Sequence, residues 1–342
     1  MNKFLPKNLT SRQLIATGAL AFAGVTSLLL IKSYFNGGVC KLAKDLTGKV
    51  IIITGANSGI GKETAAELAR LGATVILACR DIDKTLAVVS ELQSKTDNPS
   101  IDFIQLDLSD MSSIRGFVEE FKSRYDRLDV LINNAGIVAL PERKLTKDGF
   151  EVQFATNYIG PFYLTNLLLD FLKKSPPSRV INVSSVVHTA VESFDWENMN
   201  SIKNYHPFKA YFVSKLAMSM FTRELQRRLD LEGAEVKVVS LHPGAVRTEA
   251  FRNLTGFGWK LGFLLLSPFI YFASKSSKQG AQTSIYLAQE EYAFLKAGAY
   301  YSDCKVAKEN PYLSDTEATS QLWNETTKLL TNHSFTEMVK NN

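Results

Sequence analysis

Cysteine and histidine are scarce in this chain of 342 residues. Its three cysteines, Cys40, Cys79 and Cys304, form no CxxC pair, and its four histidines lie at no spacing typical of metal ligands. An odd, scattered set of thiols argues against a disulfide framework and against a structural zinc site. We therefore expect a protein that binds no metal.

Runs of basic residues are also lacking. Lys and Arg number 39 against 34 Asp and Glu, a formal net charge of +5, but they are spread along the chain. This distribution argues against a nucleic-acid partner and indicates only a mild preference for phosphates or membrane surfaces. With 45% hydrophobic and 21% charged residues, the chain is large and apolar enough for one α/β domain with a buried core.

Charge is missing altogether from residues 14–31, which read LIATGALAFAGVTSLLLI. A helix over this stretch would be about 27 Å long, close to the ~30 Å hydrocarbon core of a bilayer. A cleaved signal peptide usually has a shorter apolar core, and a buried soluble helix would carry a polar stripe. We therefore predict an uncleaved, single-pass membrane anchor. Basic residues on both sides, such as Arg12 and Lys32, leave its orientation open.

Short β-branched runs alternate with amphipathic stretches from Gly48 onward. Strands are predicted at 49–54, 74–79, 101–106, 128–133, 179–184 and 235–241. Helices are predicted between them, including 60–71, 150–173 and 210–231. Near-continuous apolar strands separated by helices predict a Rossmann-type, doubly wound α/β fold with a parallel sheet. We expect one domain at 48–331, with a tail and anchor at 1–47 before it and a tail at 332–342 after it.

A glycine-rich loop follows the first predicted strand, in TGANSGIG. Gly55, Gly59 and Gly61 allow a tight turn, let the backbone approach a pyrophosphate, and aim a helix N-terminus at the anion. Glycines alone also occur in ordinary loops. Their place between a strand and a helix makes a dinucleotide-binding loop the better interpretation.

The end of the second predicted strand indicates which dinucleotide binds. An acidic residue there suits a ribose 2′-hydroxyl, whereas an arginine suits a 2′-phosphate. The strand ends Cys79-Arg80-Asp81, and Lys62 after the loop adds a second positive charge. We therefore predict NADP(H) over NAD(H). The alternatives are that Asp81 faces the ribose, or that Arg80 is only a solvated loop residue.

Two further markers follow the third and fourth predicted strands. Asp107 could accept a hydrogen bond from the amino group of an adenine. Asn134, Ala135 and Gly136 follow the fourth strand, and the small residues would let the backbone lie close to the cofactor. Both positions are expected at the carboxyl edge of the sheet, where such folds bind their ligands.

Tyr211 and Lys215 lie four residues apart in a predicted helix and so share one helix face. A phenol has a pKa near 10 and is a poor base at neutral pH, but a neighbouring ammonium stabilises the phenolate. We expect Lys215 to lower the pKa of Tyr211 so that Tyr211 can transfer a proton. Chance Y-x-x-x-K pairs are common on exposed helices, so this pair needs the support of other residues.

Ser185 ends the fifth predicted strand, where a hydroxyl could polarise a carbonyl beside Tyr211. Ser184 should point to the opposite face, and for both serines backbone capping is the alternative. Asn157 lies within a predicted helix, where propensity alone does not favour it, and Pro161 should perturb that helix. A functional role for Asn157 is therefore expected.

These motifs together resemble those of the classical short-chain dehydrogenase/reductase family, and most closely its retinol dehydrogenase subgroup. The matching pieces are TGANSGIGKETA, ACRD, the Asp107 turn, NNAG, Asn157, NVSSVVH, YFVSK and HPGAVRT. The resemblance implies a catalytic tetrad of Asn157, Ser185, Tyr211 and Lys215. In it Tyr211 transfers the proton, Ser185 positions the substrate oxygen, Lys215 also binds the nicotinamide ribose, and Asn157 holds a water.

The resemblance also implies a set of cofactor contacts. They are Gly55, Asn57, Ser58, Gly59, Ile60, Gly61, Lys62, Arg80, Asp107, Leu108, Asn134, Ala135, Gly136, Tyr211, Lys215, Pro243, Gly244 and Thr248. Ser185 and Tyr211 are the implied substrate contacts. The chain departs from the subgroup at Tyr158 and Pro161, where histidines are usual. The tetrad is intact, so we do not infer a loss of activity.

An apolar segment at 248–275 is expected to cover the substrate. It contains Phe257, Trp259, Phe263, Leu264, Phe269 and Tyr271. It could serve as a lid, dip into a membrane surface, or simply pack as core against the sheet. The first two alternatives both indicate a hydrophobic substrate.

The predicted function is an NADP(H)-dependent oxidoreductase that interconverts a lipophilic aldehyde or ketone and its alcohol. The resemblance suggests a substrate like retinal and retinol. Two alternatives remain open: the same chemistry on a steroid or acyl-chain carbonyl, and a catalytically silent NADP-binding scaffold or sensor at a membrane. The resemblance places the protein in the endoplasmic reticulum first and the mitochondrion second.

Overall fold

The computed structural model describes residues 26, 32–33, 35–246 and 274–331. Within these ranges, no helix is both long enough and apolar enough to cross a membrane. Apart from Thr26, the predicted anchor lies outside the described residues, and so does the predicted tail at 332–342. Of the predicted lid, only Ser274 and Lys275 are described.

One eight-stranded sheet organises the described part of the chain, in the order β3-β2-β1-β4-β5-β6-β7-β8. Its strands are Val50–Thr54 (β1), Thr74–Cys79 (β2), Ile101–Gln105 (β3), Val130–Asn133 (β4), Ser178–Val183 (β5), Val236–His242 (β6), Tyr300–Ser302 (β7) and Lys305–Val306 (β8). The strand order reverses at the neighbouring strands β1 and β4. The predicted doubly wound fold is confirmed.

The far edge of the sheet differs from the prediction. β7 and β8 are absent from the six predicted strands, and β8 pairs antiparallel with β7, so the sheet is not parallel throughout. Strands of three and two residues are too short to show an alternating pattern. Their place in the sheet is decided by pairing with β6, whose Ser240 lies opposite Tyr300.

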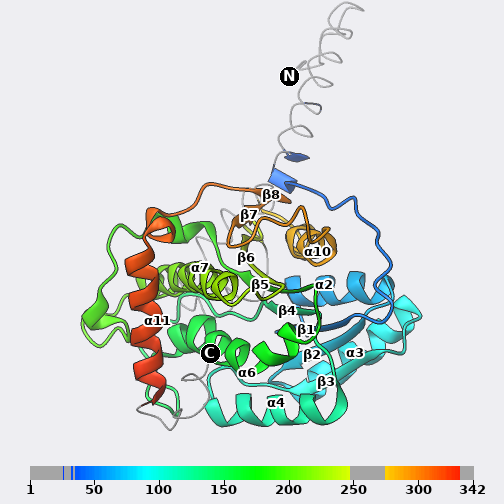
Figure 1. The fold of residues 1–342 in the computed structure, drawn as a ribbon, viewed down its shortest axis with the longest axis horizontal. Helices are drawn as coiled ribbons and strands as arrows, with labels where there is room; N and C mark the ends of the chain where they lie inside the picture. The colour runs from blue at the N-terminus through cyan, green and yellow to red at the C-terminus, as the bar shows by residue number, and fades with distance from the viewer. Residues whose placement is uncertain (1–25, 27–31, 34, 247–273, 332–342) are drawn as a thin grey trace, which may run out of the picture.

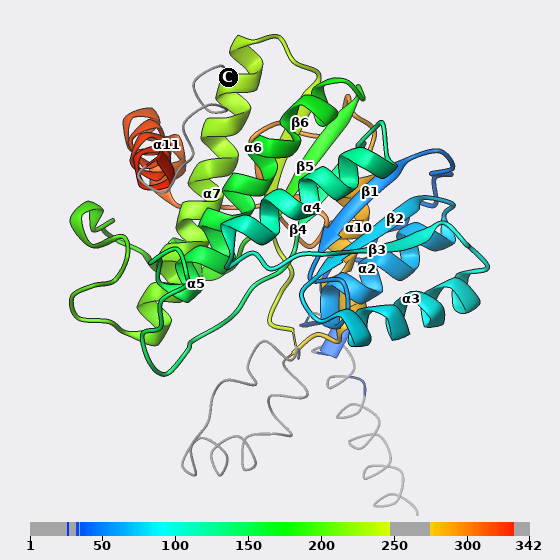
Figure 2. The same cartoon turned by 90° about the horizontal axis from the view of Figure 1, so that it is seen from below.

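Helices cover both faces of this sheet (Figures 1 and 2). One face carries α4 (Met111–Arg124), α6 (Gly160–Lys173) and α7 (Pro207–Leu231), and the other carries α2 (Gly59–Arg70), α3 (Ile82–Thr96) and α10 (Gln282–Gln289). The last described helix, α11 (Thr316–Thr331), packs against α7. The shorter elements are α5 (Val152–Phe154), η1 (Ala155–Ile159), η2 (Val186–Ala190), η3 (Trp196–Asn198), α9 (Ser277–Gly280) and η5 (Pro311–Ser314).

Strand β1 shows why the core has two halves. All five of its side chains are buried. Ile52 belongs to the apolar cluster under α4, α6 and α7, whereas Ile51 and Ile53 belong to the cluster under α2 and α3. Successive side chains of a strand point to opposite faces, so a continuous apolar run serves both clusters at once.

The predicted long helix at 150–173 is wrong in its first half. The chain forms α5, then a π-helical turn, η1, and only then α6. Pro161 explains this interruption of the helix, because it has no N–H to donate back to residue 157. The preceding Gly160 N–H donates to the Ala155 carbonyl instead, which closes the wider turn. Asn157 is at the centre of this turn and is fully buried.

Tyr158, one of the two departures from the subgroup, has a structural role. Its ring is fully buried, and its hydroxyl pairs at 2.7 Å with the hydroxyl of Thr326 in α11. Burial raises the pKa of the Tyr158 phenol. The substitution therefore helps to attach α11 to the helix that carries Asn157.

Asp129 anchors the start of β4 and gives a first testable prediction. Its carboxylate, almost fully buried, accepts hydrogen bonds from Val50 N, from Lys49 at 2.9 Å and from Arg127 at 2.7 Å. Burial by itself raises the pKa of Asp129, but the hydrogen bonds from Arg127, Val50 and Lys49 outweigh it and hold the pKa below its usual value. We expect Asp129→Asn to lower the free energy of unfolding by about 2 kcal/mol at pH 7.

The pH dependence of this loss follows from the depressed pKa. The stabilisation is present above the unfolded pKa, near 3.9, and disappears as the pH falls through the folded pKa, because the protonated wild type loses the same ion pairs. Urea unfolding at a series of pH values measures both quantities. A difference between variant and wild type that stays constant down to pH 3 would contradict the ionic role of Asp129.

Candidate active site

The glycine loop between β1 and α2 packs closely against the loop that follows β4. Gly55 has φ +66°, and a Cβ there would lie 2.9 Å from the Ala135 Cα. A Cβ on Gly61 would lie 2.5 Å from the Asn134 Nδ2. Ser58 is the N-cap of α2 but makes no capping hydrogen bond with its side chain. The loop thus presents the uncapped N-terminus of a helix, which suits a pyrophosphate.

Thr54, which is not among the predicted site residues, connects this loop to the loop after β4. Its hydroxyl accepts hydrogen bonds from Asn134 N at 3.0 Å and Ala135 N at 2.9 Å. The Asn134 side chain donates back to the Thr54 carbonyl at 2.8 Å. The sequence feature that indicates this role is the position of Thr54 at the end of a buried strand, directly before the first glycine.

Asn57 and Ile60 belong to the loop and to the first turn of α2 respectively. The Asn57 amide donates to the Thr85 hydroxyl at 3.0 Å and thereby ties the loop to α3. Burial raises the pKa of the neighbouring Cys79 thiol. A protonated thiol agrees with a structural cysteine beneath the loop.

The residues predicted to distinguish NADP from NAD each contact a different partner. Asp81 is the N-cap of α3, and its carboxylate accepts from Lys84 N at 3.0 Å. Lys62 forms an ion pair with Glu91 at 2.6 Å, and its predicted role as a second cation for a 2′-phosphate stays a prediction. Arg80, directly after β2, has an exposed side chain.

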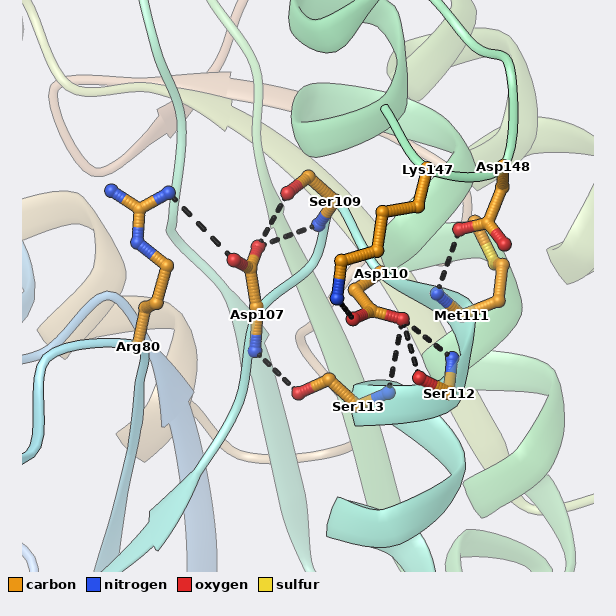
Figure 3. Close-up of polar contacts among 9 residues, drawn as sticks. All are labelled: Arg80, Asp107, Ser109, Asp110, Met111, Ser112, Ser113, Lys147 and Asp148. Atoms are coloured by element: carbon orange, nitrogen blue, oxygen red, sulfur yellow. Dashed lines mark hydrogen bonds and ion pairs between the residues drawn. The ribbon is translucent and has the colours of Figure 1, made fainter. Parts of the chain in front are cut away.

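Asp107 faces Arg80 across the carboxyl edge of the sheet (Figure 3). The closest atoms of their side chains are 3.7 Å apart. The other oxygen of Asp107 accepts from the backbone and hydroxyl of Ser109, at 2.9 and 2.6 Å. The adjacent Asp110 caps α4 and pairs with Lys147. Asp107 is therefore held in place by its own turn, and Leu108 behind it is buried.

Ser185 and Tyr211 come together as the sequence predicts. Ser185 lies two residues after the end of β5, is 8% exposed, and its hydroxyl is close enough to the Tyr211 phenol to lower the pKa of that phenol. The same hydroxyl accepts from Val187 N at 3.5 Å, so the capping alternative also holds in part. Ser184 points elsewhere: its hydroxyl donates to the Lys215 carbonyl at 2.8 Å. The two serines thus have the opposite orientations expected of neighbours on a strand.

Lys215 lies behind Tyr211 on α7, with its Nζ atom 5.8 Å from the centroid of the phenol ring. The ammonium donates to the Val183 carbonyl at 2.9 Å. Burial lowers the pKa of Lys215 to about 8. Burial also raises the pKa of Tyr211, against the lowering effect of its hydrogen bond with Ser185. Desolvation therefore outweighs the lowering effects on the phenol, so the net pKa of Tyr211 is raised, and the lowering contribution of Lys215 stays a prediction.

Asn157 holds the loop after β4 against this pair. Its Oδ1 accepts from Ile137 N at 2.8 Å, and its Nδ2 donates to the Ile137 carbonyl at 2.9 Å and to the Ser214 hydroxyl at 3.0 Å. A Cβ on Gly136 would lie 3.3 Å from both Asn157 Oδ1 and Lys215 Nζ. Gly136 therefore lies beside Asn157 and Lys215, and its predicted contact with the cofactor stays a prediction.

Pro243 and Gly244 follow β6 on the same edge of the sheet. Gly244 has φ +91°, and a Cβ there would lie 2.6 Å from the side chain of Lys275. Burial, and then the charge of Lys275, lower the pKa of His242 to about 4. Thr248 lies outside the described residues. All the other predicted cofactor contacts belong to the loops and helix starts at or near the carboxyl ends of the strands.

A glycine loop at a helix N-terminus and a tyrosine–serine pair backed by a lysine define an oxidoreductase of the nicotinamide-dinucleotide class. The profile of the family described as short chain dehydrogenase matches residues 49–256. The chain belongs to this family, whose members use NAD(P)(H) and act on CH–OH groups.

Curated relatives of the chain extend over nearly its whole length. Human retinol dehydrogenase 13 is 42% identical over 321 residues, which are 94% of this chain and 96% of that protein. Human retinol dehydrogenase 12 is 44% identical over 302 residues, 88% of this chain and 92% of that protein. The predicted resemblance to the retinol dehydrogenase subgroup is confirmed.

Solved structures share the fold. An uncharacterized protein from Mycobacterium paratuberculosis matches with a TM-score of 0.69 and 33% identity, over 86% of this chain and 98% of that one. A Pseudomonas aeruginosa protein, described as an RhlG/NADP active-site complex, matches with a TM-score of 0.59 and 26% identity, over 75% of this chain and 94% of that one.

Proposed function

We propose that this protein is an NADP(H)-dependent oxidoreductase that interconverts a lipophilic aldehyde or ketone and its alcohol. The observation that carries the proposal is the closeness of the Ser185 hydroxyl to the Tyr211 phenol, just beyond the end of β5, where it lowers the pKa of Tyr211. Lys215 and Asn157 lie directly behind it. A scaffold that only bound a nucleotide would have no use for this arrangement.

The chemistry divides between the cofactor and the chain. The nicotinamide supplies or accepts the hydride when bound. In the reductive direction, the Ser185 hydroxyl donates a hydrogen bond to the substrate oxygen and holds it beside Tyr211. The Tyr211 hydroxyl gives its proton to that oxygen as the alcohol forms, and in the oxidative direction it takes the proton back. Lys215 in its charged form stabilises the phenolate left on Tyr211.

Three observations support NADP(H) as the cofactor. The carboxylate of Asp81 caps α3, which argues against the acidic alternative for the ribose. Arg80 is exposed at the position where a 2′-phosphate is recognised in such folds. The similar Pseudomonas protein was solved with NADP, according to its description.

Replacing Arg80 with alanine tests this choice. We expect KM for NADPH to rise about tenfold, because a charge-assisted contact to phosphate contributes about 1.5 kcal/mol or more, while KM for NADH stays unchanged. Arg70→Ala is the matched control, since this exposed arginine at the end of α2 pairs with Glu67 and has no predicted contact with the cofactor. Initial rates with each cofactor give the result. Equal changes for both cofactors would show that Arg80 does not recognise the 2′-phosphate.

The proposed substrate class rests on the relatives and on the sequence. The named relatives are retinol dehydrogenases, and the segment 248–275 is rich in aromatic and aliphatic residues. NADPH oxidation at 340 nm with retinal, steroid ketones and acyl aldehydes separates the candidate classes by their relative kcat/KM. Absence of turnover on every member of the panel would contradict the proposed function.

We further propose that residues 14–31 tether the protein to a membrane, with the endoplasmic reticulum favoured over the mitochondrion. The support is the uncharged sequence of this segment. Leu20→Arg combined with Phe22→Arg should release the protein from membranes, because each arginine at the centre of a span costs about 2.5–3.5 kcal/mol. Alkaline extraction followed by immunoblotting measures the release. Exchange of two exposed residues, Lys305→Arg and Lys308→Arg, is the control, and a double-arginine variant that stays membrane-bound would contradict the tether.

A further inference from the structure

His188 is a buried histidine that the proposed chemistry does not use. It lies in η2, directly after Ser185, and its side chain is fully buried. Its Nδ1 atom lies 2.6 Å from the carbonyl oxygen of Ser185. The same carbonyl also accepts from the backbone N–H of His188 at 3.1 Å. One peptide oxygen of the predicted substrate-positioning serine is therefore held by two donors.

The partners of His188 define a single form of its ring. A carbonyl oxygen can only accept, so the Nδ1 atom facing Ser185 must carry the proton. The Nε2 atom receives the backbone N–H of Asn310 at 3.3 Å, so it must be unprotonated. Protonation of Nε2 would place two N–H groups against each other. The contacts thus specify a neutral imidazole of one tautomer, and burial lowers the pKa of His188 in the same direction.

Asn310 holds this arrangement from the far end of the chain. Its side-chain amide donates to the His188 carbonyl at 2.8 Å and to the Val191 carbonyl at 3.0 Å. Its Oδ1 accepts from Tyr312 N at 2.9 Å, which fixes the start of η5. Asn310 is 2% exposed. The segment after β8 therefore fastens η2, and with it the backbone on which Ser185 is mounted.

Tyr300 of β7 closes the other side of the imidazole. The two rings meet edge to face, with centroids 4.4 Å apart, and Tyr300 is 2% exposed. Such a ring fixes the plane of the histidine and keeps water from competing for its hydrogen bonds. Among the described residues, the other charged or titratable neighbours of His188 are Glu309 and His242.

We propose that His188 is a positioning residue, which sets the Ser185 hydroxyl for catalysis by holding the Ser185 carbonyl. The inference rests on the proposed function, in which Ser185 orients the substrate oxygen. It also assigns a role to the C-terminal part of the domain, since Asn310 and Tyr300 support the histidine.

Kinetics of the full-length protein test the proposal through a double-mutant cycle. His188→Leu removes the donor to Ser185, and we expect kcat to fall about tenfold or more with cofactor affinity unchanged, since small misplacements in an active site have large effects. His188→Asn should restore kcat to within about threefold, because its amide can reach the position of Nδ1. In a Ser185→Ala background, His188→Leu should change kcat by less than about twofold. His206→Asn, at an exposed histidine, is the control, because asparagine can still cap α7.

Additive losses in the two backgrounds would overturn the proposal, because His188 would then act independently of Ser185. A wild type that reduces no carbonyl in the panel would instead contradict the proposed function, and the positioning role with it. Thermal melting of each variant separates misfolding from misplacement, and His188→Asn keeps the test valid if His188→Leu does not fold.

A second measurement needs no turnover. The chain has four histidines, so ¹⁵N-histidine labelling gives few ring signals, and the one lost in His188→Asn belongs to His188. We expect this signal to report a neutral ring with the proton on Nδ1 at pH 7. A cationic ring, or a proton on Nε2, would overturn the proposed role of His188, independently of any activity that the enzyme shows.

Discussion

Replacing Tyr211 with phenylalanine is expected to lower kcat for carbonyl reduction by about a thousandfold, the range of a general acid or base. The variant keeps the ring but removes the hydroxyl that we propose gives its proton to the substrate oxygen. Its neighbour Ser185 keeps its hydroxyl and its cap to Val187. Cofactor affinity should therefore change little, so the loss should appear in kcat rather than in the dissociation constant for NADPH.

Stopped-flow or steady-state NADPH oxidation measures kcat, and quenching of protein fluorescence measures cofactor binding. Tyr292→Phe is the matched control, because Tyr292 is a half-buried tyrosine after α10 whose ring contacts Lys237. The control should retain wild-type kcat. Turnover of Tyr211→Phe within tenfold of the wild type would remove Tyr211 from the reaction.

Replacing Lys215 with methionine should reduce activity and stabilise the fold at the same time. Without the ammonium, the phenolate of Tyr211 loses its nearest positive charge, and we expect kcat to fall by about a hundredfold or more. The stability gain has a separate origin. Lys215 is 4% exposed, and burial lowers its pKa from 10.5 to about 8. That shift corresponds to about 3 kcal/mol by which folding disfavours the charged form at pH 7.

The sign of the pH dependence follows from this lowered pKa. The penalty on the wild type is complete below pH 8 and decreases as the pH rises toward 10.5, because the folded protein loses the proton first. The advantage of Lys215→Met in urea unfolding should therefore be largest at pH 7 and shrink toward pH 10. Lys305→Met, at an exposed lysine of β8, is the control. A variant less stable than the wild type at pH 7 would show that the Val183 hydrogen bond outweighs the cost of burial.

The sequence was most informative about features that depend on residues close together along the chain. The apolar run of β1, the glycines after it and the Y-x-x-x-K spacing each depend on residues a few positions apart. The structure places these features as predicted: Gly55 at positive φ, and Tyr211 and Lys215 on one side of α7. Periodicity and backbone freedom are short-range properties, so a sequence can show them directly.

Other features depend on what the fold brings near a residue, or on its detailed local geometry. The ion pair of Lys62 with Glu91, 29 positions away, was not predicted. One helix was predicted at 150–173, with a perturbation at Pro161, but α5 and a π-helical turn form its first part. Burial raises the net pKa of Tyr211, an effect that the spacing of Tyr211 and Lys215 does not show. Side-chain pairing and desolvation depend on what the fold brings nearby, and spacing alone does not contain that information.

By itself, the sequence determined the doubly wound class of the fold, the dinucleotide loop and the residue types of the candidate tetrad, because each leaves a local pattern of apolar, glycine and polar positions. The tertiary structure alone decided how these groups are held: which cations are already paired, how strongly burial opposes the charges of Tyr211 and Lys215, and that His188 meets Asn310 across 122 positions of the chain. Hydrogen bonds and desolvation act between groups that are close in space, and only folding makes such distant positions neighbours.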